Sequence, residues 1–410
     1  MNSPFRGFHH VDPSKTPRII ARGDGAFMVD VDGNRYLDFL GAWGPLVLGH
    51  RHPEVTAAIT QALTDGWVFG TSTEIEQQMA EAVRQALPSM EMVRFVNSGA
   101  EAVQACVRLA RAASRREVIV KLEGAYHGHV ESLDMADPLD RPNAALSGSV
   151  KALVDRTLTV PFGDASALEA LLAERARDIA AVIVEPVPGS MGVIVPHEGY
   201  LRALREITRK HDVLLIFDEV LTGFRVAYGG AQQIWGVDPD ITALGKAVGG
   251  GLPCGAYGGK RAVMERVAPV GPMYQAGTFS GNPLSMRAGL ATLEVLRRPG
   301  TYERLGALTR RLCDGFERVS AAHGVAMRAP SVGGMFGMLF TAQPVRNLDD
   351  FKRCDDPAFA RFFFAMLDQG FYFPPSQSDA AAVSTAHTEA DIDATIEAAS
   401  RSLATAVAAR

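Results

Sequence analysis

The sequence predicts an α/β protein with a large domain built on a mostly parallel sheet and a smaller α+β domain. Between about residues 93 and 257, short apolar segments alternate with segments of helical periodicity. Polar residues suited to ligand binding follow several of these apolar segments directly. After about residue 290 the alternation stops and helical patterns dominate. We therefore expect a large domain at 40–290 and a smaller, discontinuous domain formed by 1–39 and 291–410.

Near the N-terminus, the pattern predicts a hairpin followed by a helix. Residues 27–31 and 35–39 alternate apolar and polar side chains around an Asp32-Gly33 turn. Residues 53–64 begin with proline and have helical spacing. We expect the hairpin to pack with the C-terminal domain.

The central region predicts buried parallel strands separated by helices. The strand candidates are short, apolar and β-branched, as expected of strands covered on both faces: 93–96, 118–121, 158–160, 181–184 and 213–217. One intervening helix carries an apolar stripe at i, i+3 and i+4 spacing, formed by Ala102, Val103, Cys106, Val107 and Ala110. An open sheet of this kind binds its ligand at the carboxyl ends of the strands.

The C-terminal region predicts mostly helix. Residues 292–298 and 302–322 have helical spacing, residues 334–341 are a strand candidate, and residues 391–408 form a long amphipathic pattern. These elements are expected to form the smaller α+β domain.

Composition narrows the function classes. The chain has 410 residues, of which 47% are hydrophobic, with a net charge of −5 and no basic stripe, so we expect no nucleic-acid partner. Its four cysteines lack CxxC spacing, which argues against a disulfide framework or a zinc site. The paired histidines at 50/52 and 127/129 are interpreted as loop residues rather than metal ligands. With no apolar leader or membrane-length segment, a cytoplasmic protein without membrane contact is expected.

Lys246 and Asp218 carry the main chemical signal. Lys246 lies in an apolar, glycine-rich segment, and a buried amine loses part of its charged form and becomes nucleophilic toward carbonyl groups. Asp218 ends a buried-strand pattern, where a carboxylate needs a cationic partner. Pyridoxal phosphate (PLP) would supply an aldehyde for the lysine and a pyridinium nitrogen for the aspartate. Taken alone, each residue has a simpler interpretation: Lys246 as a surface lysine, and Asp218 as an ordinary aspartate at the end of a strand.

Two segments are candidate phosphate sites. Ser98, Gly99 and Ala100 join a strand to a helix, where free N–H groups favour an anion. Thr278 offers a hydroxyl group in a second segment that precedes a helix. Plain helix capping is the alternative in both places. The glycine-rich segment near Lys246 matches neither a Walker A loop nor GxGxxG.

Two further residues follow strand candidates. Tyr126 could stack on a flat cofactor or serve as a core aromatic, and Glu185 is a strand-end carboxylate at the same sheet edge as Asp218.

Together these segments resemble the class III (ω-family) aminotransferases, and among them most closely the glutamate-1-semialdehyde 2,1-aminomutases. The resemblance covers nearly the whole chain and includes residues 41–45, 126–129, 217–232, 274–278 and 375–377. It implies a fold-type I PLP-dependent transferase that forms a homodimer with active sites at the subunit interface.

The resemblance also implies roles for individual residues. Lys246 would form the Schiff base with PLP and transfer protons, and Asp218 would hold the pyridine nitrogen protonated. The other cofactor contacts would be Ser98, Gly99, Ala100, Tyr126, Glu185, Val220 and, from the neighbouring subunit, Thr278. The substrate pocket would include Ser3, Arg6, Trp43 and Asp379, with Arg6 suited to a carboxylate.

Three positions and one segment depart from the aminomutase pattern. Ala100 replaces a threonine, Ser190 replaces the usual asparagine, and Asp379 replaces a glutamate near the substrate. Residues 136–148 are shorter than the gating loop that retains the intermediate in aminomutases. We therefore expect an aminotransferase that moves an amino group from a donor such as L-glutamate to a carboxylate-bearing carbonyl acceptor by ping-pong chemistry. The alternative is an aminomutase forming 5-aminolevulinate. A nicotinamide-dependent oxidoreductase is a distant third, since GxGxxG is missing.

Overall fold

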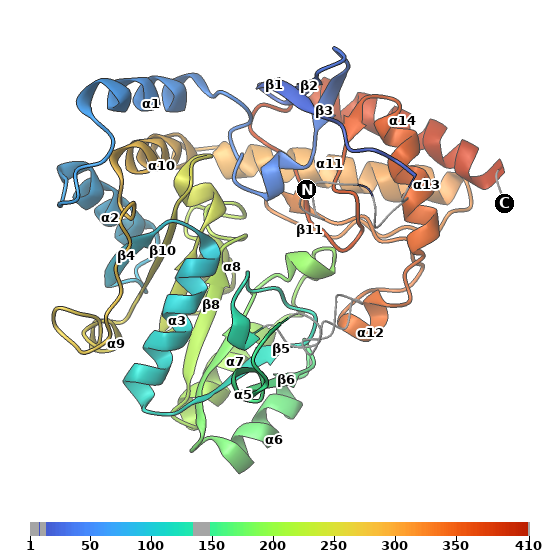
Figure 1. Ribbon diagram of the computed structural model, residues 1–410. Coiled ribbons are helices and arrows are strands. Elements are labelled where there is room, and N and C mark those ends of the chain that lie inside the picture. The colour runs from blue at the N-terminus through green and yellow to red at the C-terminus, as the bar shows by residue number, and fades with distance from the viewer. Residues whose placement is uncertain (1–7, 9–13, 134–147, 409–410) are drawn as a thin grey trace.

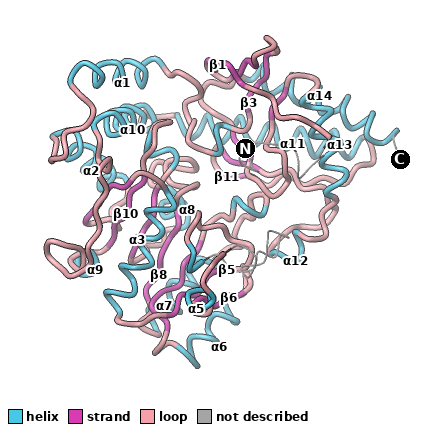
Figure 2. Tube along the Cα trace, in the orientation of Figure 1, coloured by secondary structure: helices cyan, strands magenta, loops and turns pink. Residues whose placement is uncertain are grey.

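A central seven-stranded sheet organises the larger part of the molecule (Figures 1 and 2). The computed structural model describes residues 8, 14–133 and 148–408. Ser3, Arg6 and nearly all of the 136–148 segment therefore lie outside the described residues. Within the described part of the chain, no helix is long and apolar enough to cross a membrane.

The strand order of the central sheet is β4-β10-β9-β8-β7-β5-β6. All neighbouring strands are parallel except β10, which is antiparallel to both β4 and β9. The bounds are β4 (Met92–Val96), β5 (Val118–Leu122), β6 (Thr157–Val160), β7 (Ile179–Val184), β8 (Leu214–Glu219), β9 (Ile241–Leu244) and β10 (Gly255–Gly259). The five predicted strands are thus confirmed, within two residues at each end.

Both faces of this sheet are buried under helices. On one face, α3 (Gly99–Ser114) packs its stripe of Ala102, Cys106 and Ala110 against Ile183 and neighbouring strand residues. On the other face, α6 (Ala165–Arg175) and α7 (Tyr200–Lys210) cover a cluster that includes Val182. From Ala181 to Val184, successive residues of β7 enter opposite apolar layers, which explains why this strand is apolar on both faces.

Strands β9 and β10 were not predicted. β10 has the sequence Gly-Ala-Tyr-Gly-Gly, and glycine is unfavourable in strands on propensity alone. The structure shows why glycine is needed here, because a Cβ atom on Gly255 would lie 2.3 Å from the Ser98 carbonyl oxygen. Close contact with the start of α3 overrides propensity in this strand.

The remaining elements gather around two small sheets. A four-stranded sheet has the order β1-β2-β3-β13 and a three-stranded sheet the order β11-β12-β14. Their bounds are β1 (Ile20–Asp24), β2 (Phe27–Asp30), β3 (Arg35–Asp38), β11 (Ser331–Val332), β12 (Met335–Phe336), β13 (Phe371–Tyr372) and β14 (Ala381–Ala382).

The predicted hairpin is confirmed as β2 and β3, and β13 from the C-terminal region pairs with β3 in parallel. Figure 1 shows these strands beside the C-terminal helices, away from the central sheet. The division into domains at residues 39 and 290 remains a prediction.

The predicted helices at 53–64, 302–322 and 391–408 are confirmed as α1, α11 and α14, whereas the one at 292–298 is the end of a longer helix, α10. The helices not yet given are α1 (Pro53–Asp65), α2 (Glu74–Ala86), α5 (Lys151–Val154), α8 (Gly230–Trp235), α9 (Arg261–Met264), α10 (Pro283–Leu296), α11 (Thr301–Ala322), α12 (Leu348–Phe351), α13 (Asp356–Leu367) and α14 (Glu389–Ala408). Short 3-10 turns lie at η2 (Gly41–Trp43), η3 (Glu131–Leu133), η4 (Gly189–Met191) and η5 (Lys246–Gly249).

The prediction of one strand at 334–341 is wrong for most of its length. Only Met335 and Phe336 form a strand, β12. Gly337 follows, and a Cβ atom there would lie 1.9 Å from the Gly192 carbonyl oxygen. The chain therefore leaves the sheet to make a close backbone contact with the turn after β7.

Phe39 connects the N-terminal hairpin to the C-terminal region. Its ring is fully buried and stacks on Phe373, with ring centroids 4.8 Å apart. We expect Phe39→Ala to lower the free energy of unfolding by about 3–5 kcal/mol, because it leaves a cavity where these segments meet. Urea unfolding would measure this, and Val31→Ala at an exposed position is the control, with an expected change within about 0.5 kcal/mol. A loss for Phe39→Ala no larger than that of the control would contradict the prediction.

Candidate active site

A cavity of about 420 Å³ lies at the carboxyl ends of β5, β7, β8 and β9. It brings together nine of the predicted site residues: Trp43, Gly99, Ala100, Tyr126, Glu185, Asp218, Val220, Lys246 and Asp379. Val103, His127, Gly128, Gly189, Ser190, Leu221 and Ala380 complete its lining. The predicted location of the ligand site at this sheet edge matches the position of the cavity.

Lys246 follows β9 in the 3-10 turn η5 and lines the cavity. Its φ angle is 51°, a left-handed conformation that costs a non-glycine residue about 1–2 kcal/mol. Burial lowers the pKa of the Lys246 amine, although the nearby carboxylates Glu185, Asp218 and Asp379 oppose this shift. The arrangement shifts the amine toward its neutral form, which is the nucleophilic one.

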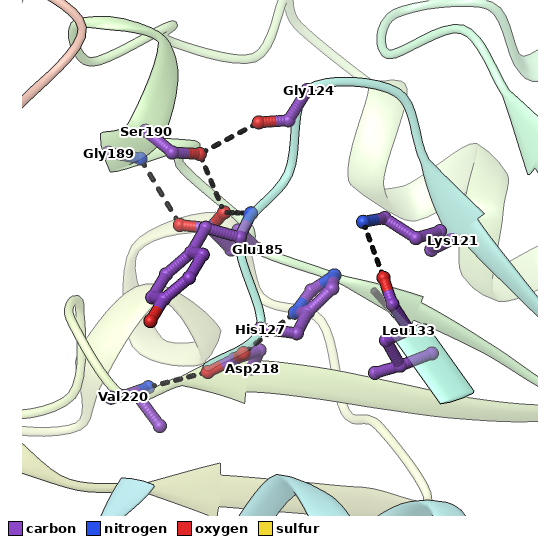
Figure 3. Close-up of polar contacts among 10 residues, drawn as sticks. Lys121, Gly124, His127, Leu133, Glu185, Gly189, Ser190, Asp218 and Val220 are labelled. Carbon is purple, nitrogen blue, oxygen red and sulfur yellow. Dashed lines mark hydrogen bonds and ion pairs between the residues drawn. The ribbon is translucent and has the colours of Figure 1, made fainter. Parts of the chain in front are cut away.

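Asp218 is 4% exposed and is held by two partners (Figure 3). The Val220 N–H group donates to its Oδ1 atom over 3.0 Å, and the His127 Nδ1 atom lies 2.7 Å from its Oδ2 atom. These two contacts hold the carboxylate in one orientation in the cavity. Asp218 is thus suited to hold a cationic ring nitrogen.

His127 is a site residue that the sequence analysis missed. It lies in a loop, as expected, but it is buried, and among the described residues its Nε2 atom has no hydrogen-bond partner. The sequence feature that could have identified His127 was its position directly after Tyr126, in the segment that follows β5. Through its contact with Oδ2, His127 can fix the orientation of the Asp218 carboxylate.

Glu185 organises the loops around the cavity, as Figure 3 shows. Its Oε1 atom accepts hydrogen bonds from the Tyr126 N–H group (2.7 Å) and the Ser190 hydroxyl group (3.1 Å), and its Oε2 atom from the Gly189 N–H group (3.2 Å). Burial raises the pKa of Glu185. These contacts fix the backbone that carries Tyr126, while direct contact between Glu185 and a cofactor remains a prediction.

The start of α3 forms an anion-binding corner. The Ser98 Oγ atom caps the helix by accepting the Glu101 N–H group over 3.1 Å, as the capping alternative expected, and Ser98 does not line the cavity. Gly99 and Ala100 do, and their N–H groups are the first two of the helix, which lack intrahelical acceptors. A Cβ atom on Gly99 would lie 2.6 Å from the Val220 side chain. This close packing requires glycine and leaves the helix start open to a phosphate group.

Thr278 lies elsewhere. It lines a second cavity of about 420 Å³ between the loop at residues 68–71 and the start of α10. Within the described part of one chain, Thr278 is therefore not brought together with Lys246. This placement is compatible with the expectation that it serves the site of a neighbouring subunit.

Comparison with known proteins assigns the family. The family model described as "Aminotransferase class-III" matches residues 9–403. The chain belongs to this family. It is 49% identical over 408 residues to a glutamate-1-semialdehyde 2,1-aminomutase of Roseiflexus castenholzii, covering 98% of this chain and 93% of that protein.

Solved structures agree with the assignment. An ω-transaminase from Sphaerobacter thermophilus is 33% identical with a TM-score of 0.91, covering 99% of this chain and 94% of the other. A lysine-to-alanine variant of a glutamate-1-semialdehyde aminomutase from Pseudomonas aeruginosa, in complex with PMP, is 27% identical with a TM-score of 0.85, covering 96% and 88%. This class III enzyme therefore has the fold-type I architecture and depends on PLP, as the sequence predicted.

The lowered pKa of Lys246 has a consequence for stability. In the cofactor-free protein, the folded state must hold an amine whose ionised form is disfavoured by burial, while the unfolded chain holds it near its usual value of 10.5. Lys246→Met should therefore raise the melting temperature at neutral pH. The gain should shrink as pH rises through the lowered pKa toward about 10.5, where the unfolded lysine also loses its proton.

Thermal melting of cofactor-free protein across this pH range would measure the effect. The exposed Lys352 offers a matched control, since Lys352→Met removes the same charge from solvent. A Lys246→Met protein that melts below the wild type at neutral pH would show that the lysine is not destabilising in the folded state.

Proposed function

We propose that this enzyme is an aminotransferase that moves an amino group from a donor such as L-glutamate to a carboxylate-bearing carbonyl acceptor. The observation that carries the proposal is the position of Lys246 and Asp218 on one cavity at the carboxyl edge of the sheet. One residue supplies a nucleophilic amine and the other a buried anion, which are the two groups that amino transfer with PLP requires.

The described residues fit the cofactor. Bound PLP would supply a reactive aldehyde and an electron-withdrawing ring. Its phosphate group would meet the free N–H groups at the start of α3, and its ring would lie between Tyr126 and Val220, which both line the cavity. Asp218 would face the ring nitrogen, with its orientation fixed by His127. Lys246 would bind the cofactor and move protons at the carbon that gains or loses the amino group.

The substrate side of the cavity departs from the aminomutase pattern. The residues on this side of the cavity are Trp43, Ser190, Asp379 and Ala380. The Ser190 hydroxyl group lies within hydrogen-bond distance of the Gly124 carbonyl oxygen and the Glu185 carboxylate, so it serves the loop. Asp379 is one methylene shorter than the expected glutamate, which leaves more room in the cavity that it lines. These differences support exchange between two separate substrates, with Ser3 and Arg6 as further contacts proposed from the resemblance.

An aminomutase that forms 5-aminolevulinate is the second candidate. The 49% identity to the Roseiflexus castenholzii protein of that name favours it. Both candidates use the same residues and differ in whether the amino group returns to the same substrate molecule.

A half-reaction without acceptor distinguishes the two candidates. Purified holoenzyme mixed with excess L-glutamate should release about one equivalent of 2-oxoglutarate per active site, because the amino group stays on the enzyme until an acceptor arrives. Lys246→Ala should release at least about 100-fold less, since it lacks the proton-transferring amine. Stopped-flow absorbance with product quantification would measure both.

Borohydride treatment gives an independent readout of the same site, because it should trap the cofactor on Lys246 of the wild type and not of Lys246→Ala. Absence of 2-oxoglutarate release, combined with growth of a 5-aminolevulinate auxotroph carrying this gene, would favour the aminomutase instead.

We infer that the enzyme works as a cytoplasmic homodimer. Thr278 borders a cavity beside Val68 and Phe69, in a loop whose large apolar side chains are exposed. Trp67 is 53% exposed and Phe69 is 54% exposed, an unusual concentration for a surface loop. A second copy packed on this loop would cover these side chains and could bring Thr278 to the phosphate end of its partner's site.

Phe69→Glu should therefore weaken the dimer. A charge placed among apolar side chains at an interface is costly to bury, so we expect monomers and at least about tenfold weaker PLP retention. Light scattering after size exclusion would give the mass, and dialysis followed by absorbance the retention. Val31→Glu, at an exposed apolar position on the distant hairpin, should leave both unchanged. A Phe69→Glu dimer of normal stability would contradict this interface.

A further inference from the structure

Four consecutive residues beside the cavity have left-handed backbone conformations. The φ angles of Gly41, Ala42, Trp43 and Gly44 are 54°, 55°, 67° and 114°. Two of the four are not glycine, so this turn is unfavourable in isolation and needs support from its surroundings. Since Trp43 lines the cavity, the support of this turn bears directly on the shape of the substrate pocket.

Asp38 supports the beginning of the turn. Its Oδ1 atom accepts the Leu40 N–H group over 2.8 Å and the Gly41 N–H group over 3.0 Å. Its Oδ2 atom lies 2.7 Å from the His50 Nε2 atom. The first half of the turn is thus tied to the end of β3.

Arg225 supports the end of the turn. Its side chain is 0% exposed, and its Nε and Nη2 groups both donate to the Gly44 carbonyl oxygen, with an Nε distance of 3.2 Å. Its Nη1 group donates to the Val383 carbonyl oxygen over 3.1 Å. Burial lowers the pKa of Arg225 only to about 10, so it stays charged at neutral pH and makes charge-assisted hydrogen bonds.

The turn also contacts the reactive lysine. A Cβ atom on Gly44 would lie 3.0 Å from the Lys246 Cδ atom and 2.8 Å from the Leu221 Cδ1 atom. The backbone of the turn therefore packs on the stem of Lys246, while the adjacent Trp43 faces the cavity. A shift of Gly44 would move both the lysine stem and the tryptophan.

We propose that Arg225 is a positioning residue for the substrate pocket: by holding the Gly44 and Val383 carbonyl groups together, it fixes the left-handed turn and sets the place of Trp43. This inference rests on the proposed aminotransferase function only for its kinetic consequence. The position of Trp43 itself can be measured without substrate or catalysis.

The test uses Trp43 as its own reporter. The sequence has three tryptophans, so Trp67→Phe and Trp235→Phe leave Trp43 as the sole emitter. In this background, Arg225→Met removes all three donors. Arg225→Lys keeps the charge, but its single ammonium group does not reproduce the planar fork that grips both carbonyl groups. We expect the acrylamide quenching constant of Trp43 to rise about twofold or more in Arg225→Met, with a smaller rise in Arg225→Lys.

Arg304 offers a matched control. It donates to the Thr385 and His387 carbonyl oxygens, both over 2.7 Å, on the same C-terminal segment but away from Gly44. Arg304→Met should leave Trp43 quenching unchanged. With L-glutamate as the probe substrate, Arg225→Lys should raise KM about tenfold to a hundredfold with a smaller effect on kcat, because the pocket loses its preset shape.

The outcomes separate the two proposals. If Arg225→Lys lowers the melting temperature but leaves Trp43 quenching and KM as in the parent, Arg225 serves stability alone and the inference is overturned. If Arg225→Met fails to fold, the Arg225→Lys comparison still decides. If the parent enzyme does not turn over L-glutamate, the proposed donor is wrong, while the quenching comparison still decides the role of Arg225.

Discussion

The interaction on which the site depends is the burial of one amine among carboxylates. Lys246 loses solvent at the end of β9, and Asp218, Glu185 and Asp379 partly compensate for that loss. The net effect lowers the pKa of the Lys246 amine without isolating it in a purely apolar environment. Asp218 is held in turn by the Val220 N–H group and His127. Asp218 therefore relies on fixed neighbours, and the fold must hold these neighbours in place.

The parallel sheet achieves this by ending several strands at one edge. Asp218 belongs to β8, Glu185 follows β7, and Lys246 follows β9, so neighbouring strands deliver the three side chains to one cavity. The loops after the strands then need close backbone packing. Glycine at positions 99 and 189 permits it, because a Cβ atom there would collide with Val220 or Leu221. The glycines of these segments thus reflect the close packing of side chains around the site, as well as the room that a bound phosphate group would require.

Much of this arrangement could be predicted from the sequence because it depends on local pattern. Buried strands, strand-end carboxylates and the helix start at Gly99 all leave a signature within a few residues. What escaped prediction depends on contacts between distant segments. β10 contains glycine at its start because Gly255 packs against the Ser98 backbone, and the segment after Phe336 leaves its sheet because Gly337 meets Gly192. His127 gains its role only when the fold places it 2.7 Å from Asp218, 91 positions later in the chain.

The same reasoning explains why the substrate side is harder to predict than the cofactor side. The proposed cofactor contacts come mainly from the central sheet and the helix behind it, whereas the proposed substrate wall combines Trp43 with Asp379 and Ala380 from the far end of the chain. Arg225 joins these segments by binding one carbonyl group from each, at Gly44 and Val383. Its side chain does not line the cavity, so no argument from pocket residues alone would single it out. A change in how these two outer segments meet would therefore alter the proposed substrate wall of this enzyme without altering Lys246 or Asp218.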